Sequence, residues 1–481
     1  MKRKIVALWL VLSLLLVPLA AGAEATVTAE ETAAMVEAMM AAVMESEEIT
    51  SLFAEEITEE TGTIPCNGYA DEVLTVYTLK HGGSELRFLQ EIIGEADENG
   101  LYPLYITLHG GGEAEAAFNN DQWIDMFYYY KIGVENGIYV SVRGVSDTWD
   151  LHFQEETYPL LDALITNLTV TEHADPNRVY LLGFSAGGDG VYQLGPRLAD
   201  RFAAVNMSSG HPNGVSLVNM ANCPICLQTG IRDYYSENAR RSVRCAEFAK
   251  TLEDYRELFG FGYEHQVWIH VPEGHNYVDF ADSQSKVLAD PTAFAEREEA
   301  ENMLGTLLQA AQTDSISDLS YWGGGMDEEF DETITSVVRD IFGLELEEAN
   351  TNAVRWVSQY ERNPTPTELV WDLWTRAASR EITSWYWLQA EPSVNAGIIY
   401  ASFDSESNTF TIAPNEDVNG DFAILFMANM VDTGRPVTIV SPKGEYSLQV
   451  DPSEEMMLES FTERMDPDMV CIGKIMYSEI Q

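Results

Sequence analysis

Between residues 70 and 284, short β-rich runs alternate with stretches of helical pattern, and this alternation restricts the possible folds most. The runs cover residues 73–79, 86–92, 104–108, 138–142, 179–184, 203–207, 225–229 and 267–271. Amphipathic segments such as 158–168 and 246–259 lie between several of them. Strands that alternate with helices indicate an α/β fold with a mostly parallel sheet. The first two runs have no helix between them and predict a leading hairpin.

The remaining segments differ in composition and suggest further units. A chain of 481 residues is long enough for two or three domains. We expect a signal peptide over 1–23, an N-terminal helical segment over 24–65 and an α/β core over 66–284. An acidic helical insertion follows over 285–352, then a closing helix or linker over 353–365. Short, turn-punctuated strands over 366–481 predict a small C-terminal antiparallel β domain.

The first residues indicate export. Lys2, Arg3 and Lys4 precede an apolar run over 5–19, and small residues at 21–23 suit a cleavage site near Ala23. The protein is therefore expected to be secreted or held at the cell surface, with an uncleaved membrane anchor as the alternative. No later segment reaches the 18 or so apolar residues of a membrane span, so we expect no stable membrane insertion of the mature chain.

Charge excludes some classes of partner. The chain carries 78 acidic against 27 basic residues, a net charge of −51. Such a surface repels phosphate backbones and anionic lipids, so neither nucleic acid nor acidic membranes are expected partners. Cysteine is sparse, with five in the chain, and this number does not indicate a disulfide framework. Cys223 and Cys226 have redox-motif spacing, but they open a strand pattern and are interpreted as core residues.

The most specific motif is Gly183-Phe-Ser-Ala-Gly187, which follows a β-rich run and precedes a helical segment. This strand–turn–helix context is that of a nucleophile elbow, in which Ser185 is exposed on a tight turn. The glycines are needed because a Cβ two positions on either side of the serine would clash with the neighbouring strand and helix. An ordinary glycine-rich turn is the alternative interpretation.

A second glycine-rich loop, 109–112, follows the run at 104–108. In nucleophile-elbow enzymes, a backbone N–H of this loop pairs with the N–H of the residue after the nucleophile to hold an oxyanion. We therefore predict Ala186 and either Gly111 or Gly112 as the two donors. A tight turn without a ligand is the alternative.

The order nucleophile, acid, base identifies the other two members of a catalytic triad. Asp233 follows the run at 225–229 and His275 follows the run at 267–271, so both lie past strand ends. Asp189 and Asp279 are weaker candidates for the acid. His211, which follows the strand after the elbow, competes with His275 and is otherwise predicted in the substrate pocket.

No residue cluster predicts a metal site or a cofactor. The acidic turn at 415–421 lacks the distal bidentate glutamate of a calcium loop. The glycines at 323–325 lack the strand and the Lys-Ser/Thr pair of a phosphate loop.

Residues 183–200 as a whole resemble a group of secreted α/β-hydrolases that includes polyhydroxybutyrate depolymerases and feruloyl-esterase-like proteins. This group is similar to the dienelactone hydrolases. Further similar motifs lie at 108–112, 119–123, 148–152 and 210–213, and in the C-terminal region at 362–366, 385–388, 430–432 and 435–437. The resemblance covers most of 75–280 and 353–470. It implies the α/β-hydrolase fold, the triad Ser185, Asp233 and His275, and an ester-hydrolase activity without a named substrate. Resemblance and polarity also suggest His109, Trp123, Trp149, Tyr192 and His211 as pocket residues. For Trp123, Trp149, Tyr192 and His211, a place in the core is the alternative.

The insertion is where the chain departs from this group. Residues 281–352 contain 17 acidic and 3 basic residues, a local net charge of −14, and they start beside the predicted base. We expect them to form a lid or wall at the pocket, or alternatively a surface excursion that points away from it.

These patterns predict a secreted serine hydrolase that acts on small or polymeric carboxylic esters through an acyl-enzyme. One alternative is a peptidase of the prolyl-oligopeptidase type, since the same triad cleaves amides. The other is a non-catalytic protein on a hydrolase scaffold, whose C-terminal domain contacts a polymer or glycan.

Overall fold

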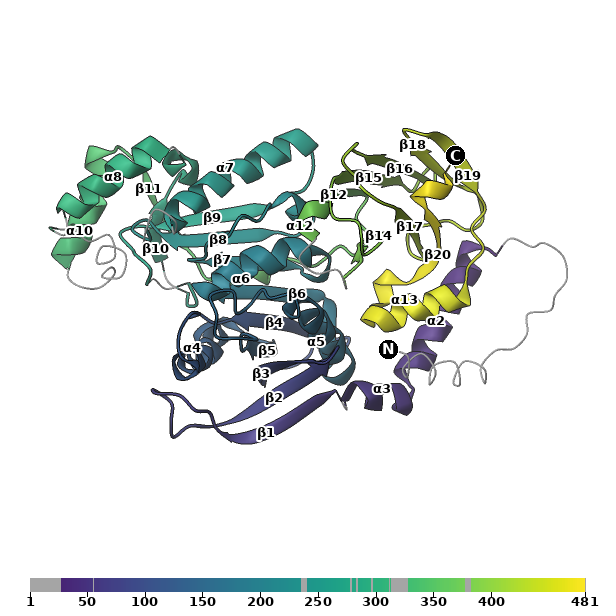
Figure 1. Ribbon diagram of the computed structural model, residues 1–481, viewed down its shortest axis with the longest axis horizontal. Coiled ribbons are helices and arrows are strands. Elements are labelled where there is room, and N and C mark those ends of the chain that lie inside the picture. The colour runs from purple at the N-terminus through teal and green to yellow at the C-terminus, as the bar shows by residue number, and fades with distance from the viewer. Residues whose placement is uncertain are drawn as a thin grey trace.

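The computed structural model describes residues 27–480 except 55, 235–239, 277, 278, 283, 296, 311, 313–327 and 377–381. The predicted signal peptide lies outside the described residues. Within them, one large mixed sheet is joined to a smaller C-terminal unit of two sheets (Figure 1). The large sheet has the order β1-β2-β3-β5-β4-β6-β7-β8-β9-β10-β11.

The predicted parallel core is the centre of this sheet, where β5, β4, β6, β7, β8 and β9 run parallel. β2 and β3 form the predicted hairpin, and β3 pairs with β5 in antiparallel fashion. The strands up to β9 are β1 (Ile57–Thr63), β2 (Val73–His81), β3 (Ser84–Ile93), β4 (Tyr102–Leu108), β5 (Gly137–Val142), β6 (Ala174–Phe184), β7 (Ala204–Ser208), β8 (Ile225–Gly230) and β9 (His265–His270).

Alternation along each central strand fills two cores, one on each face of the sheet. In β4, Leu104, Ile106 and Leu108 belong to one core cluster, whereas Tyr105 belongs to the other. This is the two-residue period of a strand that is buried on both sides. The first cluster includes side chains of α5 (Thr157–Thr171), α6 (Ala186–Leu194) and α7 (Arg241–Phe259), and the second includes those of α4 (Ala116–Tyr129) and α11 (Ala353–Val357).

The acidic insertion contains strands as well as helices. β10 (Gln284–Leu288) pairs with β9, and β11 (Leu346–Asn350) pairs with β10, so both strands extend the large sheet at its edge. Between them lie η5 (Pro291–Phe294), α8 (Arg297–Ala310), α10 (Glu328–Ser336) and η6 (Val337–Ile341). The charge pattern did not indicate these two strands, because β11 is a mostly polar edge strand and β10 buries only its last two residues, Val287 and Leu288.

The N-terminal segment likewise contains two helices and a strand. α2 (Ala29–Met44) begins with a capping box, in which Thr28 and Glu31 exchange side-chain and backbone hydrogen bonds. α3 (Glu47–Ala54) follows, and then β1 at the sheet edge. α2 lies beside α13 (Glu454–Arg464) of the C-terminal unit (Figure 1), and the buried Thr32 and Thr433 hydroxyls are 3.0 Å apart.

The C-terminal unit packs two sheets against each other. One has the order β12-β15-β16-β18-β19 and the other β13-β14-β17-β20, and all described pairs are antiparallel except β16 with β18. The strands are β12 (Glu368–Asp372), β13 (Ser384–Trp385), β14 (Leu388–Ala390), β15 (Ile398–Asp404), β16 (Thr409–Pro414), β17 (Phe422–Met427), β18 (Val437–Ser441), β19 (Gly444–Leu448) and β20 (Cys471–Met476); a short helix, α12 (Leu373–Arg376), follows β12.

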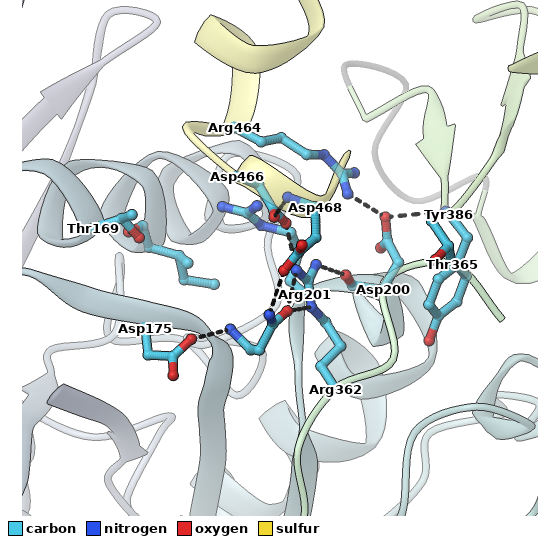
Figure 2. Close-up of polar contacts among 12 residues, drawn as sticks. Thr169, Asp175, Asp200, Arg201, Arg362, Thr365, Tyr386, Arg464, Asp466 and Asp468 are labelled. Carbon is cyan, nitrogen blue, oxygen red and sulfur yellow. Dashed lines mark hydrogen bonds and ion pairs between the residues drawn. The ribbon is translucent and has the colours of Figure 1, made fainter. Parts of the chain in front are cut away.

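Buried ion pairs join this unit to the α/β core (Figure 2). Arg464 donates to Asp200, with 2.6 Å between Nη1 and Oδ2, and Asp200 is fully buried. Arg362 pairs with Asp466 and also donates to the Asp200 carbonyl oxygen at 2.8 Å. Asn177 of the core accepts from the Arg362 guanidinium at 2.8 Å. The two units therefore share a desolvated polar interface rather than a flexible joint.

Arg464→Met tests this interface. Removal of the guanidinium leaves the Asp200 carboxylate buried without its ion-pair partner, which typically costs about 3–5 kcal/mol of unfolding free energy. The matched control is Lys250→Met, which breaks the exposed pair with Asp254 and should cost about 0.5 kcal/mol or less. Urea unfolding followed by tryptophan fluorescence measures both. A loss below about 1 kcal/mol for Arg464→Met would contradict this account.

Candidate active site

Ser185 lies on the tight turn between β6 and α6, as the motif predicts. Its backbone angles are φ 59° and ψ −120°, a region that non-glycine residues rarely adopt, and its N–H donates to the Ser208 carbonyl oxygen at 2.9 Å. A Cβ on Gly183 would lie 2.2 Å from the Gly187 oxygen, and one on Gly187 would lie 1.9 Å from the Leu108 oxygen. Only glycine fits at these two positions.

The structure brings Ser185, His275 and Asp233 together. His275 Nε2 lies 2.9 Å from Ser185 Oγ, and His275 Nδ1 lies 2.8 Å from Asp233 Oδ2. Nδ1 donates to the carboxylate, which leaves Nε2 to accept the serine proton. The residues come from the turn after β6, the loop after β8 and the loop after β9, so three parallel strands deliver them to one edge of the sheet.

Asp233 is ionised although it is fully buried. Burial raises its pKa, but the charges of His275 and Arg241 outweigh this and lower the pKa to about 2. Arg241, at the start of α7, places Nη1 3.4 Å from Asp233 Oδ1. The carboxylate can therefore stabilise an imidazolium at His275 across the physiological range of pH. Sequence reasoning missed Arg241, since nothing in its pattern sets it apart from other arginines.

The glycine loop, residues 109–112, lies against Ser185. Its hydrogen bonds distinguish the N–H of Gly111 from that of Gly112, the two alternatives predicted as an oxyanion donor. A Cβ on Gly110 would lie 3.4 Å from Ser185 Cβ. The Gly112 N–H donates to Asn119 Oδ1 at 2.9 Å, so the prediction of Gly112 as an oxyanion donor is wrong. Among the described residues, none accepts a hydrogen bond from the Gly111 N–H. Ala186 is the first residue of α6, where backbone N–H groups lack intrahelical partners. Ala186 and Gly111 remain as the candidate pair.

His109 supports this loop and does not face a substrate, which corrects its prediction as a pocket residue. Its ring is fully buried and accepts a hydrogen bond from the Gly144 N–H at Nε2, 3.1 Å away. His152 Nε2 donates to the His109 carbonyl oxygen at 2.8 Å. Burial lowers the pKa of His109, and it lowers that of His152 to about 3, so both rings are neutral. They hold the glycine loop in place.

Two other predicted pocket residues belong to the core. Trp123 and Tyr192 are both fully buried, and the Trp123 indole donates to the Ser141 carbonyl oxygen. Their burial shows that the prediction of both as pocket walls is wrong. The error arose because the sequence alone does not tell an aromatic residue on a buried helix face from one that lines a binding site.

Trp149 and His211 remain near the site. Trp149 is 51% exposed and lines a hollow of about 520 Å³ with Glu113, Glu115, Asp147 and others. A Cβ on Gly112 would lie 3.4 Å from Trp149 Cα, so this hollow adjoins the glycine loop. His211 is half-buried, and its N–H donates to Asp189 at 2.6 Å.

Both rival acids have other partners. Asp189 accepts from His211 and Asn213. Asp279 accepts from the hydroxyls of Tyr129 and Tyr130, at 2.7 and 2.8 Å, and from Ser208 Oγ at 2.5 Å. Asp279 is fully buried four residues after His275, so it ties the histidine loop to α4, η1 (Tyr130–Gly133) and β7.

The described residues contain no group of three or more His, Cys, Asp or Glu side chains that could hold a metal ion. No helix among them is long and apolar enough to cross a membrane. The five cysteines are free, and burial raises the thiol pKa of Cys223 and Cys226, which suits core residues.

Comparisons with solved structures find an esterase, a depolymerase and a peptidase among the similar chains. No family model matches the sequence, and no curated protein matches it. A thermostable esterase is 18% identical over 45% of this chain and 55% of its own, with a TM-score of 0.29. A poly(3-hydroxybutyrate) depolymerase from Bordetella parapertussis is 16% identical over 55% and 92%, with a TM-score of 0.33. An acylaminoacyl peptidase from Pyrococcus horikoshii is 16% identical over 59% and 45%, with a TM-score of 0.30.

The chain thus spans about half the length of the esterase and of the peptidase. At these identities and TM-scores the likeness carries no argument. The parallel sheet, the strained serine turn and the order Ser185, Asp233, His275 along the chain confirm the expected α/β-hydrolase fold.

Gly187→Ala tests the steric basis of the serine turn. The new Cβ would lie 1.9 Å from the Leu108 oxygen, so β4 or the turn must move, and we expect a loss of about 3 kcal/mol or more. Gly305→Ala in α8 is the control, since nothing lies within 4 Å of its Cβ position, and it should gain about 0.5–1 kcal/mol. Thermal unfolding compares the two. Equal melting temperatures for Gly187→Ala and the unaltered protein would disprove the constraint.

Proposed function

We propose that this protein is a serine hydrolase that cleaves carboxylic esters through an acyl-enzyme. The hydrogen-bonded chain from Asp233 through His275 to Ser185, with distances of 2.8 and 2.9 Å, is the observation that carries the proposal. A serine oxygen is a weak nucleophile unless an adjacent base takes its proton, and this chain supplies the base and its orienting carboxylate. The fold and the resemblance of the motifs to secreted esterases support the ester class.

The proposed reaction has two steps. Ser185 Oγ attacks the ester carbonyl carbon while His275 Nε2 takes the serine proton. The N–H groups of Ala186 and Gly111 stabilise the negative charge on the carbonyl oxygen. The C–O bond to the alcohol then breaks, and the imidazolium returns its proton to that oxygen. Water, deprotonated by His275, next attacks the acyl-enzyme and releases the carboxylic acid and Ser185.

The hollow beside the glycine loop suggests where part of the substrate lies. It combines the exposed indole of Trp149 with the carboxylates of Glu113 and Glu115 and with Asp147, which is paired with Arg143. An apolar or uncharged group can pack on the indole, whereas a negative charge is repelled. We therefore propose a preference for neutral over anionic esters. His211 is a further pocket residue in this proposal, since it lies where the chain leaves β7.

Ser185→Ala should lower kcat by about 10⁴ or more without unfolding the protein, and Asp233→Asn should lower it by about 10⁴ through the wrong histidine tautomer. Ser405→Ala, an exposed serine on a turn, is the matched control and should keep full activity. A panel of p-nitrophenyl esters of rising acyl length, feruloyl esters and peptide amides measures kcat and KM. Full activity in Ser185→Ala would overturn the mechanism.

The same panel also tests the substrate class. Faster cleavage of peptide amides than of esters would replace the esterase with a peptidase. If a fluorophosphonate probe does not label Ser185, a non-catalytic binding protein takes its place. Added salt should raise the turnover of an anionic ester more than that of a neutral one, because it screens the acidic hollow.

We also propose that the protein is exported, with its signal peptide removed near Ala23. The basic, apolar and small-residue segments of residues 1–23 support this proposal. N-terminal sequencing of the protein from the medium or the cell surface tests it, and an intact Met1 on all of the protein would contradict it. Contact of the C-terminal unit with a polymer or glycan stays a prediction, which co-sedimentation with insoluble polyester or polysaccharide measures.

A further inference from the structure

The acidic insertion stands at the same end of the large sheet as the candidate active site. In Figure 1, α8 and α10 lie beyond the ends where β8 and β9 lead into the loops of Asp233 and His275. β10 and β11 anchor the insertion at the sheet edge, and the Val271 N–H donates to the Lys286 carbonyl oxygen at 2.9 Å. In this position the insertion can contact the loops that carry Asp233 and His275.

One contact joins α10 to the residue next to Asp233. Cζ of Arg232 lies 5.1 Å from the ring centroid of Phe330, which is on α10. Arg232 is completely buried, and a desolvated cation over an aromatic ring is attracted more strongly than an exposed one. The Phe330 ring therefore fixes the position of the Arg232 guanidinium against α10.

Arg232 also holds the loop that carries His275. Its backbone N–H donates to the Glu273 carbonyl oxygen at 3.0 Å, and its Nε donates to the Pro272 carbonyl oxygen at 2.5 Å. A Cβ on Gly230 would lie 2.0 Å from the Gly274 oxygen, so the two loops are in direct contact. Arg232 thus links three parts of the molecule: Phe330 on α10, the aspartate loop and the histidine loop.

We infer that α10 is a positioning element of the catalytic site, in which Phe330 fixes the Arg232 guanidinium so that Arg232 holds Pro272 and Glu273 in place. This inference rests on the proposed function, but it differs from a lid. A lid governs which substrate enters and so changes KM. A support behind the histidine loop governs how well His275 is aligned with Ser185, and so changes kcat, because small misplacements of reacting groups cost large factors in rate.

The charges around Glu273 give this contact a pH dependence. Burial, and next the charge of Asp331, raise the pKa of Glu273 to about 7, although Arg232 lowers it. Glu273 lines a cavity of about 580 Å³, together with the ionisable residues His270, Lys286, Asp331 and Glu332. Burial lowers the pKa of His270 to about 3, so it stays neutral. The stability from a neutral Glu273 is therefore complete at acid pH and is lost as the pH rises through about 7.

Phe330→Ala is the decisive variant. We expect kcat for a neutral ester to fall by about tenfold or more, KM to change by less than about twofold, and fluorophosphonate labelling to slow by the factor seen in kcat. Phe330→Tyr keeps the ring and should restore activity. Phe342→Ala is the matched control, because Phe342 is also half-buried in the insertion, packed on the same core cluster, and should keep kcat. Unchanged kcat in folded Phe330→Ala, or a raised KM alone, overturns the inference.

A second measurement does not depend on activity. Hydrogen exchange of the backbone around residues 271–276 should become faster in Phe330→Ala than in Phe342→Ala or the unaltered protein. Equal protection in all three overturns the positioning role, whether or not the protein hydrolyses esters. Failure of the unaltered protein to cleave any ester or to react with the probe contradicts the proposed function instead, and the exchange comparison still decides the role of α10.

The pH profile supplies a third readout. Ionisation of Glu273 beside Asp331 should weaken the α10 contact, so kcat should decline as the pH rises through about 7. Glu273→Gln should remove this decline. Glu332→Gln, from the same cavity wall, should leave it in place. A decline that persists in Glu273→Gln contradicts the role of this carboxyl group.

Discussion

The close approach of the serine turn to β4 is the constraint on which the rest of the site depends. Gly187 packs against the Leu108 carbonyl oxygen so tightly that no side chain fits between them. This contact fixes where α6 begins, and so the direction of the Ala186 N–H and the exposure of Ser185. It also brings the turn against the glycine loop, since that loop starts directly after Leu108. The nucleophile and the groups that receive the developing charge are therefore set by one packing contact between the start of α6 and the end of β4.

Burial governs the electrostatics around this turn. His109 and His152 are held neutral by desolvation, so they shape the glycine loop without competing for the serine proton. Asp233 is equally buried but keeps its charge, because His275 and Arg241 compensate for the loss of solvent. The same fold thus keeps His109 and His152 neutral by burial and places His275 beside an ionised carboxylate. Among the described histidines, His275 is the one that faces both a carboxylate and the serine, so it is placed for proton transfer.

Much of this arrangement was predictable from sequence because it follows from local patterns and chain order. The strands around 104–108, 179–184 and 225–229, the serine turn, and Asp233 and His275 past strand ends all appear in the structure. The errors concern burial and hydrogen-bond partners. Trp123 and Tyr192 are core residues, and a helical aromatic gives no local sign of which face it occupies. The sequence could not separate Gly112 from Gly111 as oxyanion donors, because the hydrogen bond from the Gly112 N–H to Asn119 depends on the fold. The contact of Arg232 with Phe330 joins distant segments, so no local pattern could indicate it.

The packing of α2 on the C-terminal unit has a consequence for how the chain folds. Thr32 and Thr433, whose hydroxyls meet in the buried contact, are 401 positions apart in sequence. Helix α2 is synthesised early, but α13, beside which it lies, follows almost the whole length of the described chain. Contacts between such distant segments slow folding because a large loop must close first. The apolar face of α2, with Val36, Met39 and Val43, therefore stays uncovered until the C-terminal unit has formed, and during that interval it needs protection from aggregation.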